Sequence, residues 1–502
     1  MRSSALAITI SKSRYMAGVQ CLKRLYLLVH QPELGNGKTA ADFALMDQGR
    51  QVGKLAQGLF PGGIEVRTGD PQEAIRVTQD LIENPDVPAI FEAAFEQDRV
   101  FVRVDILHRR RDGRWRLIEV KSSASMKDEH SQDVAIQYRV GTKCGLDVAS
   151  CHLATVNRQY TFPGGDIDPW RFFRIRNVTR RVQNLQPTLV FQLRSEFRVL
   201  AMSEAPDLPT GKHCSTPMLC EFYDQCNSPR PDAHIGFLPY IHASAIEELE
   251  GLGVESIRDI PDDFQLTEIQ RRAATCVQTG QPWFDKESLK TEIGALKYPL
   301  FFMDFETVNP CLPRFVGMHP YDHICFQYSV HVLRGPGAAT EHFEFLTKDR
   351  NDPRREFIAS LCDVLGECGS IVVYNAAFES QRLSELAARL PEFAERIKGI
   401  QARLWDLLPL IRNNVYHPAF AGSYSLKSVL PALVPEMSYG GMEVANGQDA
   451  GLAWESLLRD AGDQAERERL RKALLDYCRQ DTLALVKILE KLKLEGRGSL
   501  QE

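Results

Sequence analysis

The segment YPLFFMDFETV, residues 298–308, is an almost unbroken apolar run that contains two carboxylates. Such a run favours a buried strand, and a buried strand excludes charged side chains that lack a partner. Side chains two residues apart on a strand share a face, so Asp304 and Glu306 point the same way. Two acids pressed together repel each other unless a divalent cation lies between them. This pattern predicts a core strand with Asp304 and Glu306 as metal ligands.

The length of the chain, 502 residues, exceeds what one hydrophobic core usually organises, so we expect two or three domains. Hydrophobic residues make up 44% of the chain, yet no apolar run approaches the ~20 residues that span a bilayer. The N-terminal apolar run is too short for a secretory signal, and twelve cysteines without such a signal argue against a disulfide framework. We therefore expect a cytoplasmic protein that does not bind a membrane. The net charge of −6 excludes a surface coated in basic groups but leaves room for a local basic groove.

The pattern of apolar residues divides the chain into three regions. Residues 1–235 carry helical patterns, a pair of strands and a group of cysteines. Residues 236–290 favour short helices, because apolar residues at helical spacing are interrupted by Gly251 and Pro261. Residues 291–502 favour strands and helices and end in a long helix. We therefore predict an α/β protein in which a small helical module separates two α/β domains.

A second pattern that combines strands with charge lies upstream. The segments FVRVDILHRR and RWRLIEVKSS, joined by the turn-like RRDGR, predict a β-hairpin. Glu119 and Lys121 project from one face of the second strand, and Asp105 on the first strand can lie beside them. Metal-assisted phosphodiester hydrolysis uses such a set, in which acids hold Mg²⁺ or Mn²⁺ and the ammonium positions the attacking water. The simpler interpretation is a surface hairpin with an ordinary salt bridge, because E-x-K is frequent by chance.

The order Asp105, Glu119, Lys121, followed by Gln137 in DVAIQYRV, resembles the PD-(D/E)xK nucleases of the RecB type. This group includes CRISPR-adaptation nucleases that carry an iron–sulfur cluster, and the resemblance covers most of residues 8–230. It implies a restriction-endonuclease-like fold with Asp105 and Glu119 as metal ligands and with Lys121 and Gln137 as catalytic residues.

One position departs from that family. A histidine that often binds metal in the family is replaced here by Gly53, in GRQVGKLAQ. The resemblance then leaves Glu92 or Asp133 to complete the metal shell, or a site that holds its metal more weakly.

Three cysteines in GKHCSTPMLCEFYDQC follow the spacing C-x5-C-x5-C. A loop-like segment with this spacing can bring three thiolates to one point, and a distant fourth would close the coordination. By count, four thiolates suit Zn²⁺ and an iron–sulfur cluster equally well. In the RecB-type nucleases the fourth cysteine follows an N-terminal S-x-S pattern, here SKSRYMAGVQC. The resemblance implies a [4Fe–4S] cluster, with Zn²⁺ as the alternative, held by Cys21, Cys214, Cys220 and Cys226.

Two further acidic positions follow the first strand motif. SIVVYNAAFESQRLSEL predicts a buried strand, a loop and a helix that carries Glu379 near its start. LLDYCRQDTLALV places Tyr477 and Asp481 four residues apart, on one face of a helix. Asp406, in LWDLLPLIRNN, is another acid, which we interpret first as a residue at a helix start and second as a ligand.

The motifs MDFET, YNAAFESQRL and YCRQD together resemble those of the DEDD-type, DnaQ-like 3′–5′ exonucleases that carry a tyrosine, over residues 297–492. The resemblance implies a ribonuclease H-like fold and two metal ions held by Asp304, Glu306 and Asp481, with Tyr477 orienting the attacking water. It makes Glu379, which stands where the family usually has Asp, a further metal ligand. Asn375, four residues earlier, becomes a contact for nucleic acid.

Basic residues that could hold a substrate lie in RFFRIRNVTRR, residues 171–181. Arg171, Arg174 and Arg176 would contact phosphates. The alternative is an amphipathic helix whose phenylalanines belong to the core, and we favour that alternative for the phenylalanines. In the helical module, ELEGLGVESIRDIP is similar to helix–hairpin–helix elements that grip the DNA backbone, but its acidity fits a spacer equally well.

These patterns predict a metal-dependent nuclease with two nuclease-like domains and a helical module between them. DNA is the expected substrate and partner, because iron–sulfur nucleases of the first type process DNA ends. The alternatives are a 3′–5′ exonuclease that acts on RNA, and a nucleic-acid-binding scaffold in which one or both sites are inactive. The sequence identifies no protein partner.

Overall fold

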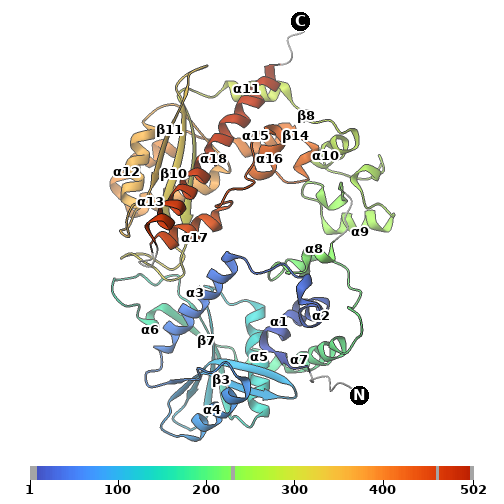
Figure 1. The fold of residues 1–502 in the computed structure, drawn as a ribbon, viewed down its shortest axis with the longest axis vertical. Helices are drawn as coiled ribbons and strands as arrows, with labels where there is room; N and C mark the ends of the chain where they lie inside the picture. Colours follow the sequence, from blue (N-terminus) through green and yellow to red (C-terminus); the bar gives the residue numbers. More distant parts are fainter. Residues whose placement is uncertain (1–7, 228–231, 459–462, 498–502) are drawn as a thin grey trace. The chain divides into compact units, whose positions relative to one another are not determined.

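The computed structural model describes residues 8–227, 232–458 and 463–497. The chain forms two compact units, of which unit 1 comprises Met1–Ser228 and Pro310–Asp322, and unit 2 comprises Pro229–Asn309 and His323–Glu502. The chain therefore passes from one unit to the other after residues 228, 309 and 322. Each unit contains a mixed β-sheet and α-helices (Figure 1), so the predicted α/β class is confirmed.

The sheet of unit 1 has the strand order β2-β3-β4-β5-β6-β7, and β1 pairs in parallel with β4. Antiparallel pairs join β3 to β4, β4 to β5 and β6 to β7, whereas β5 and β6 are parallel. The β4–β5 pair is the predicted hairpin. The strands are β1 (Ile10–Ser11), β2 (Ile64–Glu65), β3 (Ala89–Gln97), β4 (Val100–Arg109), β5 (Trp115–Lys121), β6 (Val148–Val156) and β7 (Phe173–Asn177).

Helices cover both faces of this sheet. The helices are α1 (Lys12–Gln20), α2 (Leu22–His30), α3 (Ala40–Gln57), α4 (Pro71–Glu83), α5 (Asp128–Lys143), α6 (Pro169–Phe172), α7 (Thr179–Leu200) and α8 (Tyr223–Cys226). One core contains residues of α1, α2, α4, α5 and α7 together with alternate residues of β4 such as Val102 and Val104. The other contains Ile106 and Ile118 with residues of α3 and with Cys311 from the 310–322 segment. This segment is therefore part of the core of unit 1.

The sheet of unit 2 has the order β11-β10-β9-β12-β13. Strand β9 pairs antiparallel with β10 and parallel with β12, and β10 pairs antiparallel with β11. A separate two-stranded sheet joins β8 to β14. The strands are β8 (Trp283–Phe284), β9 (Leu300–Val308), β10 (Ile324–Leu333), β11 (Thr340–Leu346), β12 (Ser370–Val373), β13 (Leu404–Asp406) and β14 (Val415–Tyr416).

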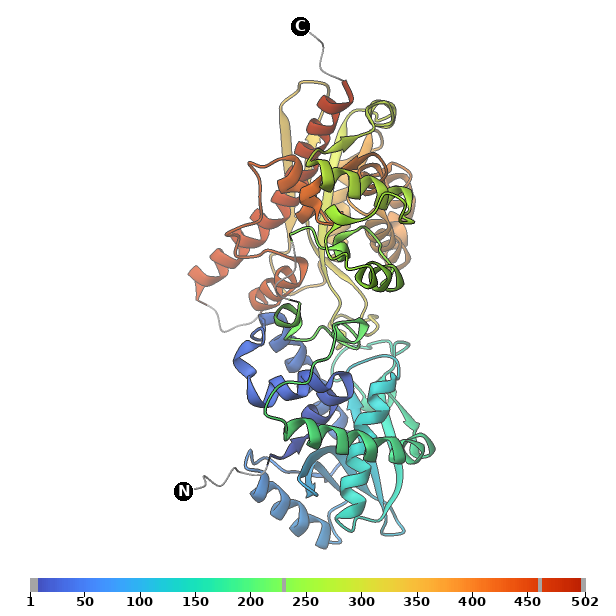
Figure 2. The same cartoon turned by 90° about the vertical axis from the view of Figure 1, so that its right-hand side faces the viewer.

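Helices lie on both faces of the larger sheet, and α18 runs along one of them (Figures 1 and 2). Leu300 and Phe302 of β9 share a core with α18, whereas Phe301, Met303 and Phe305 pack with α12, α13 and α14 on the opposite face. The helices are α9 (Ala243–Gly251), α10 (Glu268–Thr279), α11 (Lys286–Gly294), α12 (Arg354–Leu365), α13 (Ala376–Arg389), α14 (Ala394–Gln401), α15 (Leu407–Asn414), α16 (Leu426–Leu433), α17 (Gly447–Leu457) and α18 (Gln464–Arg497).

The predicted helical module forms short helices, as expected, but its apolar residues do not make a core of their own. Leu249 and Ile257 belong to the same hydrophobic core as Phe302 of β9 and Leu489 of α18. The module is therefore packed into unit 2.

The segment 171–181 differs from the helix that we favoured. Residues 173–177 form β7, and α7 begins at Thr179. Phe172 and Phe173 are buried, as predicted for core residues. The alternation of Phe173 and Ile175 with outward arginines has the period of a strand, which explains the difference.

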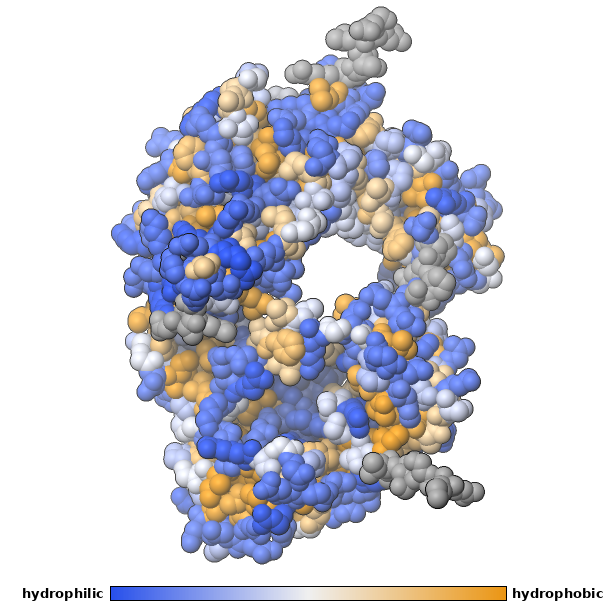
Figure 3. Space-filling model, viewed as in Figure 1, coloured by the Kyte–Doolittle hydropathy of each residue, from blue (hydrophilic) through white to orange (hydrophobic). Residues whose placement is uncertain are grey.

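Hydrophilic residues cover most of the face in Figure 3, and hydrophobic residues form small separate groups on it. Among the helices of the described residues, none is both long enough and apolar enough to cross a bilayer.

Candidate functional site

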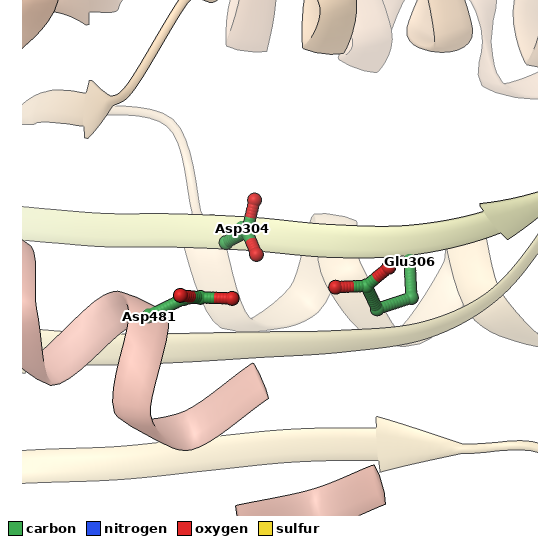
Figure 4. A group of neighbouring side chains, drawn as sticks. All are labelled: Asp304, Glu306 and Asp481. Atoms are coloured by element: carbon green, nitrogen blue, oxygen red, sulfur yellow. The ribbon is translucent and has the colours of Figure 1, made fainter. Parts of the chain in front are cut away.

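Three carboxyl groups come together in unit 2, two from β9 and one from α18 (Figure 4). Asp304 and Glu306 lie on the face of β9 that packs against α18, because they continue the alternation of Leu300 and Phe302. One oxygen from each of Asp304, Glu306 and Asp481 lies within 4.8 Å of the other two. The sequence predicted these three residues in one pocket, and the structure brings them together.

The three acids are in an environment that opposes their ionisation. Glu306 and Asp481 are only 8% and 7% exposed, and Asp304 is half-buried. Burial, with repulsion from Asp481, raises the pKa of Glu306 to about 8, and burial raises the pKa of Asp481 to about 6. Burial and the neighbouring acids hold the pKa of Asp304 well above its usual range. Three ionised carboxylates here therefore call for a cation.

Glu379 and Asp406 have different roles beside this group. Glu379, in the first turn of α13, is 2% exposed, and burial raises its pKa to about 8. Within the described residues its Oε2 has no hydrogen-bond partner, and its charge acts on Asp304, although it lies outside the group of three. Asp406 accepts hydrogen bonds from the backbone N–H groups of Asn375, Ala376 and Leu408, at 2.9, 2.9 and 3.0 Å. Asp406 is thus the residue at the start of α15, as we interpreted it.

Two tyrosines and a lysine surround Asp481. Tyr439 donates a hydrogen bond to Asp481 Oδ1 at 2.5 Å, and the rings of Tyr439 and Tyr477 are 6.3 Å apart. The Nζ atom of Lys427 lies 5.7 and 5.9 Å from the centres of these two rings. The charge of Lys427 acts against burial and lowers the pKa values of Glu306 and Asp481. Sequence reasoning found Tyr477 but missed Tyr439 and Lys427.

The unit 2 group fits a divalent metal ion by its chemistry. All its donors are carboxylate oxygens, which Mg²⁺ and Mn²⁺ prefer. A cation placed among Asp304, Glu306 and Asp481 would also relieve the repulsion that raises their pKa values.

A second charged cluster lies in unit 1 and contains the residues of the RecB-type resemblance. Lys121 Nζ donates to Glu119 Oε1 at 2.7 Å, and Gln137 Nε2 donates to Glu119 Oε2 at 2.7 Å. Asp133 of α5 accepts from Gln137 at 3.0 Å and forms an ion pair with Lys121. Asp105 accepts from the backbone N–H of Val120 at 2.7 Å. The structure thus brings the predicted residues together with Asp133, one of the two acids that the resemblance left to complete the metal shell.

Lys12, the first residue of α1, is the member of this cluster that sequence reasoning missed. Its Nζ atom lies 3.0 Å from Glu119, 3.4 Å from Asp133 and 4.0 Å from Asp105. Nothing in the local spacing singles out this lysine, because the carboxylates lie about a hundred residues away in the sequence.

The pKa of the most buried acid in this cluster is lowered, whereas the pKa values of the unit 2 acids are raised. Glu119 is 1% exposed; burial would raise its pKa, but the charges of Lys12 and Lys121 outweigh burial and lower it below the usual range. Burial raises the pKa values of Asp105 and of the adjacent Glu92. The buried charge of Glu119 is therefore balanced by cations of the protein itself.

The four predicted cysteine ligands line one cavity in unit 1, together with residues that include Lys23, His213 and Phe222. All four are free thiols, and a backbone N–H, that of Gly211, points to Cys214 Sγ at 3.4 Å. Gln20, which precedes Cys21, donates to the carbonyl oxygens of His213 and Met218, at 2.7 and 2.8 Å. The four thiols line one cavity, but within the described residues the metal-ligating atoms that lie within 4.8 Å of one another are those of Asp304, Glu306 and Asp481 and not these thiols.

The predicted arginine contacts lie at the edge of the unit 1 sheet. Arg174 and Arg176 are exposed residues of β7, the last strand in the sheet order, and Arg171 is exposed in α6. Arg174 donates to Gln159 at 2.5 Å. Asn375, the other predicted contact, precedes α13 with a left-handed backbone conformation, φ 73°.

Comparison with known proteins gives one matching family and one distant relative, neither of them described by an activity. Residues 301–425 match a family described as "Domain of unknown function (DUF2779)". The chain is also 23% identical to "Uncharacterized protein UU173" of Ureaplasma parvum, over 38% of this chain. The aligned part spans 31% of that relative's length. The matched residues 301–425 include Asp304, Glu306 and Glu379.

Proposed function

We propose that unit 2 is a metal-dependent nuclease that removes nucleotides from the 3′ end of DNA. The observation that carries this proposal is the group formed by Asp304, Glu306 and Asp481, of which the last two are buried and the first half-buried, with oxygens within 4.8 Å of one another. The order of the sheet, with β9 at its centre between antiparallel β10 and parallel β12, is in keeping with a ribonuclease H-like domain.

The chemistry of the reaction explains why such a group is useful. A phosphodiester is anionic, repels hydroxide and has a poor leaving oxygen, and two bound divalent ions supply charge neutralisation, a nucleophile and stabilisation of the leaving oxygen. Asp304, Glu306 and Asp481 would hold these ions. Glu379, whose Oε2 has no hydrogen-bond partner in the described part of the chain, would complete the shell directly or through water.

The tyrosines beside Asp481 would direct the attack. The Tyr477 hydroxyl would orient the water that attacks the terminal phosphodiester. Tyr439 holds Asp481 through its hydrogen bond and so fixes the carboxylate. Lys427, whose ammonium lies over both rings, would contact a phosphate of the substrate strand.

The test is release of nucleotides from end-labelled single-stranded DNA with Mn²⁺. Asp481→Asn should lower the rate by at least ~100-fold, as loss of a principal electrostatic group commonly does. The matched control is Asp476→Asn, an exposed acid on the same helix α18, which should retain the full rate. Equal rates for the two variants would show that the triad is not the catalytic site.

Two alternatives make different predictions in the same assay. An RNA exonuclease would prefer an RNA strand of the same sequence, because the carboxylate chemistry does not itself reject a 2′-hydroxyl. A nucleic-acid-binding scaffold with inactive sites would bind the labelled strand and release no nucleotide from either substrate.

For unit 1, the RecB-type nuclease fold with Asp105 and Glu119 as metal ligands and the [4Fe–4S] cluster remain predictions. The position of Cys21, Cys214, Cys220 and Cys226 in the lining of one cavity supports a shared centre, although their sulfur atoms do not form a group as close as the unit 2 carboxylates. An absorbance shoulder near ~400 nm in anaerobically purified protein would indicate iron–sulfur, and its absence together with bound zinc would indicate the alternative.

A further inference from the structure

The path of the chain carries Lys12 into the carboxylate cluster of unit 1. Strand β1 pairs in parallel with β4, with Ile10 opposite Val100 and Ser11 opposite Phe101. The residue after β1 is Lys12, and β4 also carries Asp105. The ammonium of Lys12 reaches three acids from two strands and a helix, at 3.0, 3.4 and 4.0 Å.

We propose that the ammonium of Lys12, rather than a divalent metal ion, is the resident cation of the cluster formed by Asp105, Glu119 and Asp133. The nuclease activity of this chain would then come from unit 2 alone, and unit 1 would serve another task, such as holding the substrate strand.

The hydrogen bonds of the cluster leave few oxygen lone pairs for a metal ion. Glu119 Oε1 accepts from Lys12 and Lys121, and Glu119 Oε2 accepts from Lys12 at 3.3 Å and from Gln137 at 2.7 Å. Asp133 accepts from Gln137 on one oxygen and from Lys121 on the other. Asp105 Oδ2 accepts from Val120. Mg²⁺ and Mn²⁺ require several free oxygen ligands, whereas an ammonium needs only acceptors within reach, which Lys12 has in both oxygens of Glu119.

The two lysines balance two of the three acids of the cluster, and Asp105 is the third. Lys12 and Lys121 face Glu119 and Asp133, and Gln137, which is fully buried, supplies a neutral donor. A buried ion pair persists when its oxygens are hydrogen-bonded, and each oxygen of Glu119 and Asp133 accepts at least one hydrogen bond here. Adding a divalent ion would require displacement of Lys12.

Helix α1 holds Lys12 in place from its other end. Gly18 packs so closely on α7 that a Cβ atom there would lie 2.4 Å from Glu196 Oε1. Gln20 donates to two carbonyl oxygens of the cysteine segment. Because α1 is fixed along its length, its first residue is positioned in advance.

The test measures binding of Mn²⁺ to the silenced chain, the full chain in which Asp304→Asn and Asp481→Asn have removed the unit 2 site. Binding is measured by calorimetry and by the decrease of the spin-resonance signal of free Mn²⁺. Mn²⁺ prefers oxygen ligands, so the cysteine cavity does not interfere. The silenced chain should bind no Mn²⁺ at millimolar concentration. Adding Lys12→Met should create a site for one ion that Glu119→Gln removes. Lys54→Met, an exposed lysine on α3, is the control and should create none.

Two outcomes overturn the proposal. One is Mn²⁺ binding to the silenced chain that Glu119→Gln abolishes while Lys12 is intact. The other is a folded Lys12→Met chain, verified by circular dichroism, that gains no Mn²⁺ site. If Lys12→Met does not fold, Lys12→Gln tests the same point, because it keeps a donor and removes the charge. Failure of the proposed nuclease function would appear separately, as an inactive chain with an intact unit 2 group.

Discussion

At the scale of single residues, Asp481 is held by one tyrosine and faces a second, and these two hydroxyls have separable roles. Tyr439 donates directly to the carboxylate. Tyr477 lies one helical turn before Asp481 on α18, and in the proposed reaction its hydroxyl would orient the attacking water.

Tyr477→Phe should lower the rate of nucleotide release by roughly 10- to 100-fold, the cost of a poorly positioned nucleophile. The Michaelis constant for DNA should change little, because the hydroxyl orients water and does not hold the strand. Tyr416→Phe, a buried tyrosine in the core of unit 2, is the control for loss of a hydroxyl. A rate unchanged by Tyr477→Phe would remove this residue from the mechanism.

The raised pKa values of the triad predict a pH dependence of stability in the absence of metal. Burial raises the pKa of Glu306 to about 8, so the folded state binds more protons than the unfolded state between the ordinary pKa and about 8. Stability should therefore fall as the pH rises through this range. Asp304→Asn, which removes one of the repelling charges, should raise the melting temperature in EDTA at pH 8. The melting temperature should rise by about 2–4 °C for each kcal/mol by which the free energy of unfolding increases.

Mn²⁺ should produce the same stabilisation in the unaltered chain, because it binds the ionised carboxylates of the folded state only. Calorimetric melting with and without Mn²⁺, at pH 6 and pH 8, measures both effects. A melting temperature in EDTA that rises with pH over this interval would contradict the expected direction of the effect.

The sequence alone predicted site residues whose partners lie close to them in the sequence or on the same strand. It did not predict site residues whose partners are far away in the sequence. Asp304 and Glu306 could be predicted because a two-residue spacing in an apolar run fixes their common face. Lys427, Tyr439 and Lys12 could not, because each reaches its acid across long stretches of chain and lies in a segment of ordinary polarity. A lysine at a helix start is usually solvated, and only the fold distinguishes this one.

At the scale of elements, the helices and strands that could be predicted were those with a strong periodic pattern of apolar residues. The apolar run of β9 and the long apolar stripe of α18 predicted both elements, and Asp304, Glu306 and Asp481 meet where these two elements pack together. The segment 173–177 forms a strand although a helix was expected, because its short run of alternating residues also fits a helix with scattered arginines.

Helix α1 offers a test of close packing with a matched control. Gly18→Ala should destabilise the chain by about 1–3 kcal/mol, because the added methyl group meets the buried Glu196 side chain. Gly53→Ala, in the middle of α3 with open space around the new Cβ, should be neutral or stabilising by about 0.5–1 kcal/mol. Urea unfolding of both variants measures the difference. Equal stabilities would mean that α7 moves aside without cost.

At the scale of the whole molecule, the 310–322 segment joins β9 to β10 but belongs to unit 1. The two strands pair with Val308 opposite Ile324, so their ends are adjacent and need no long connection. Within unit 1, the backbone N–H of Phe162 donates to the carbonyl oxygen of Met318 at 2.9 Å, and the side chains of Cys311 and Met318 are fully buried. The long connection is thus required by unit 1 and not by the hairpin.

Replacing residues 310–322 with a short turn should leave Mn²⁺-dependent nucleotide release intact while weakening unit 1. Loss of a fully buried methionine and cysteine should cost roughly 2–5 kcal/mol there. Hydrogen exchange of the amides of β4 and β5 should accelerate, while that of β9 and β10 stays unchanged. Equal acceleration in both sheets would show that the segment stabilises the whole chain and not unit 1 in particular.

The same connection sets an order of events during synthesis. A chain leaves the ribosome from its N-terminus, and domains usually fold as they emerge. Here the first unit lacks part of its interior until residue 322 has been made, nearly two thirds of the way along. The core of unit 1 is therefore incomplete while the first strands of unit 2 are already being translated. We expect the two units to complete their folding together.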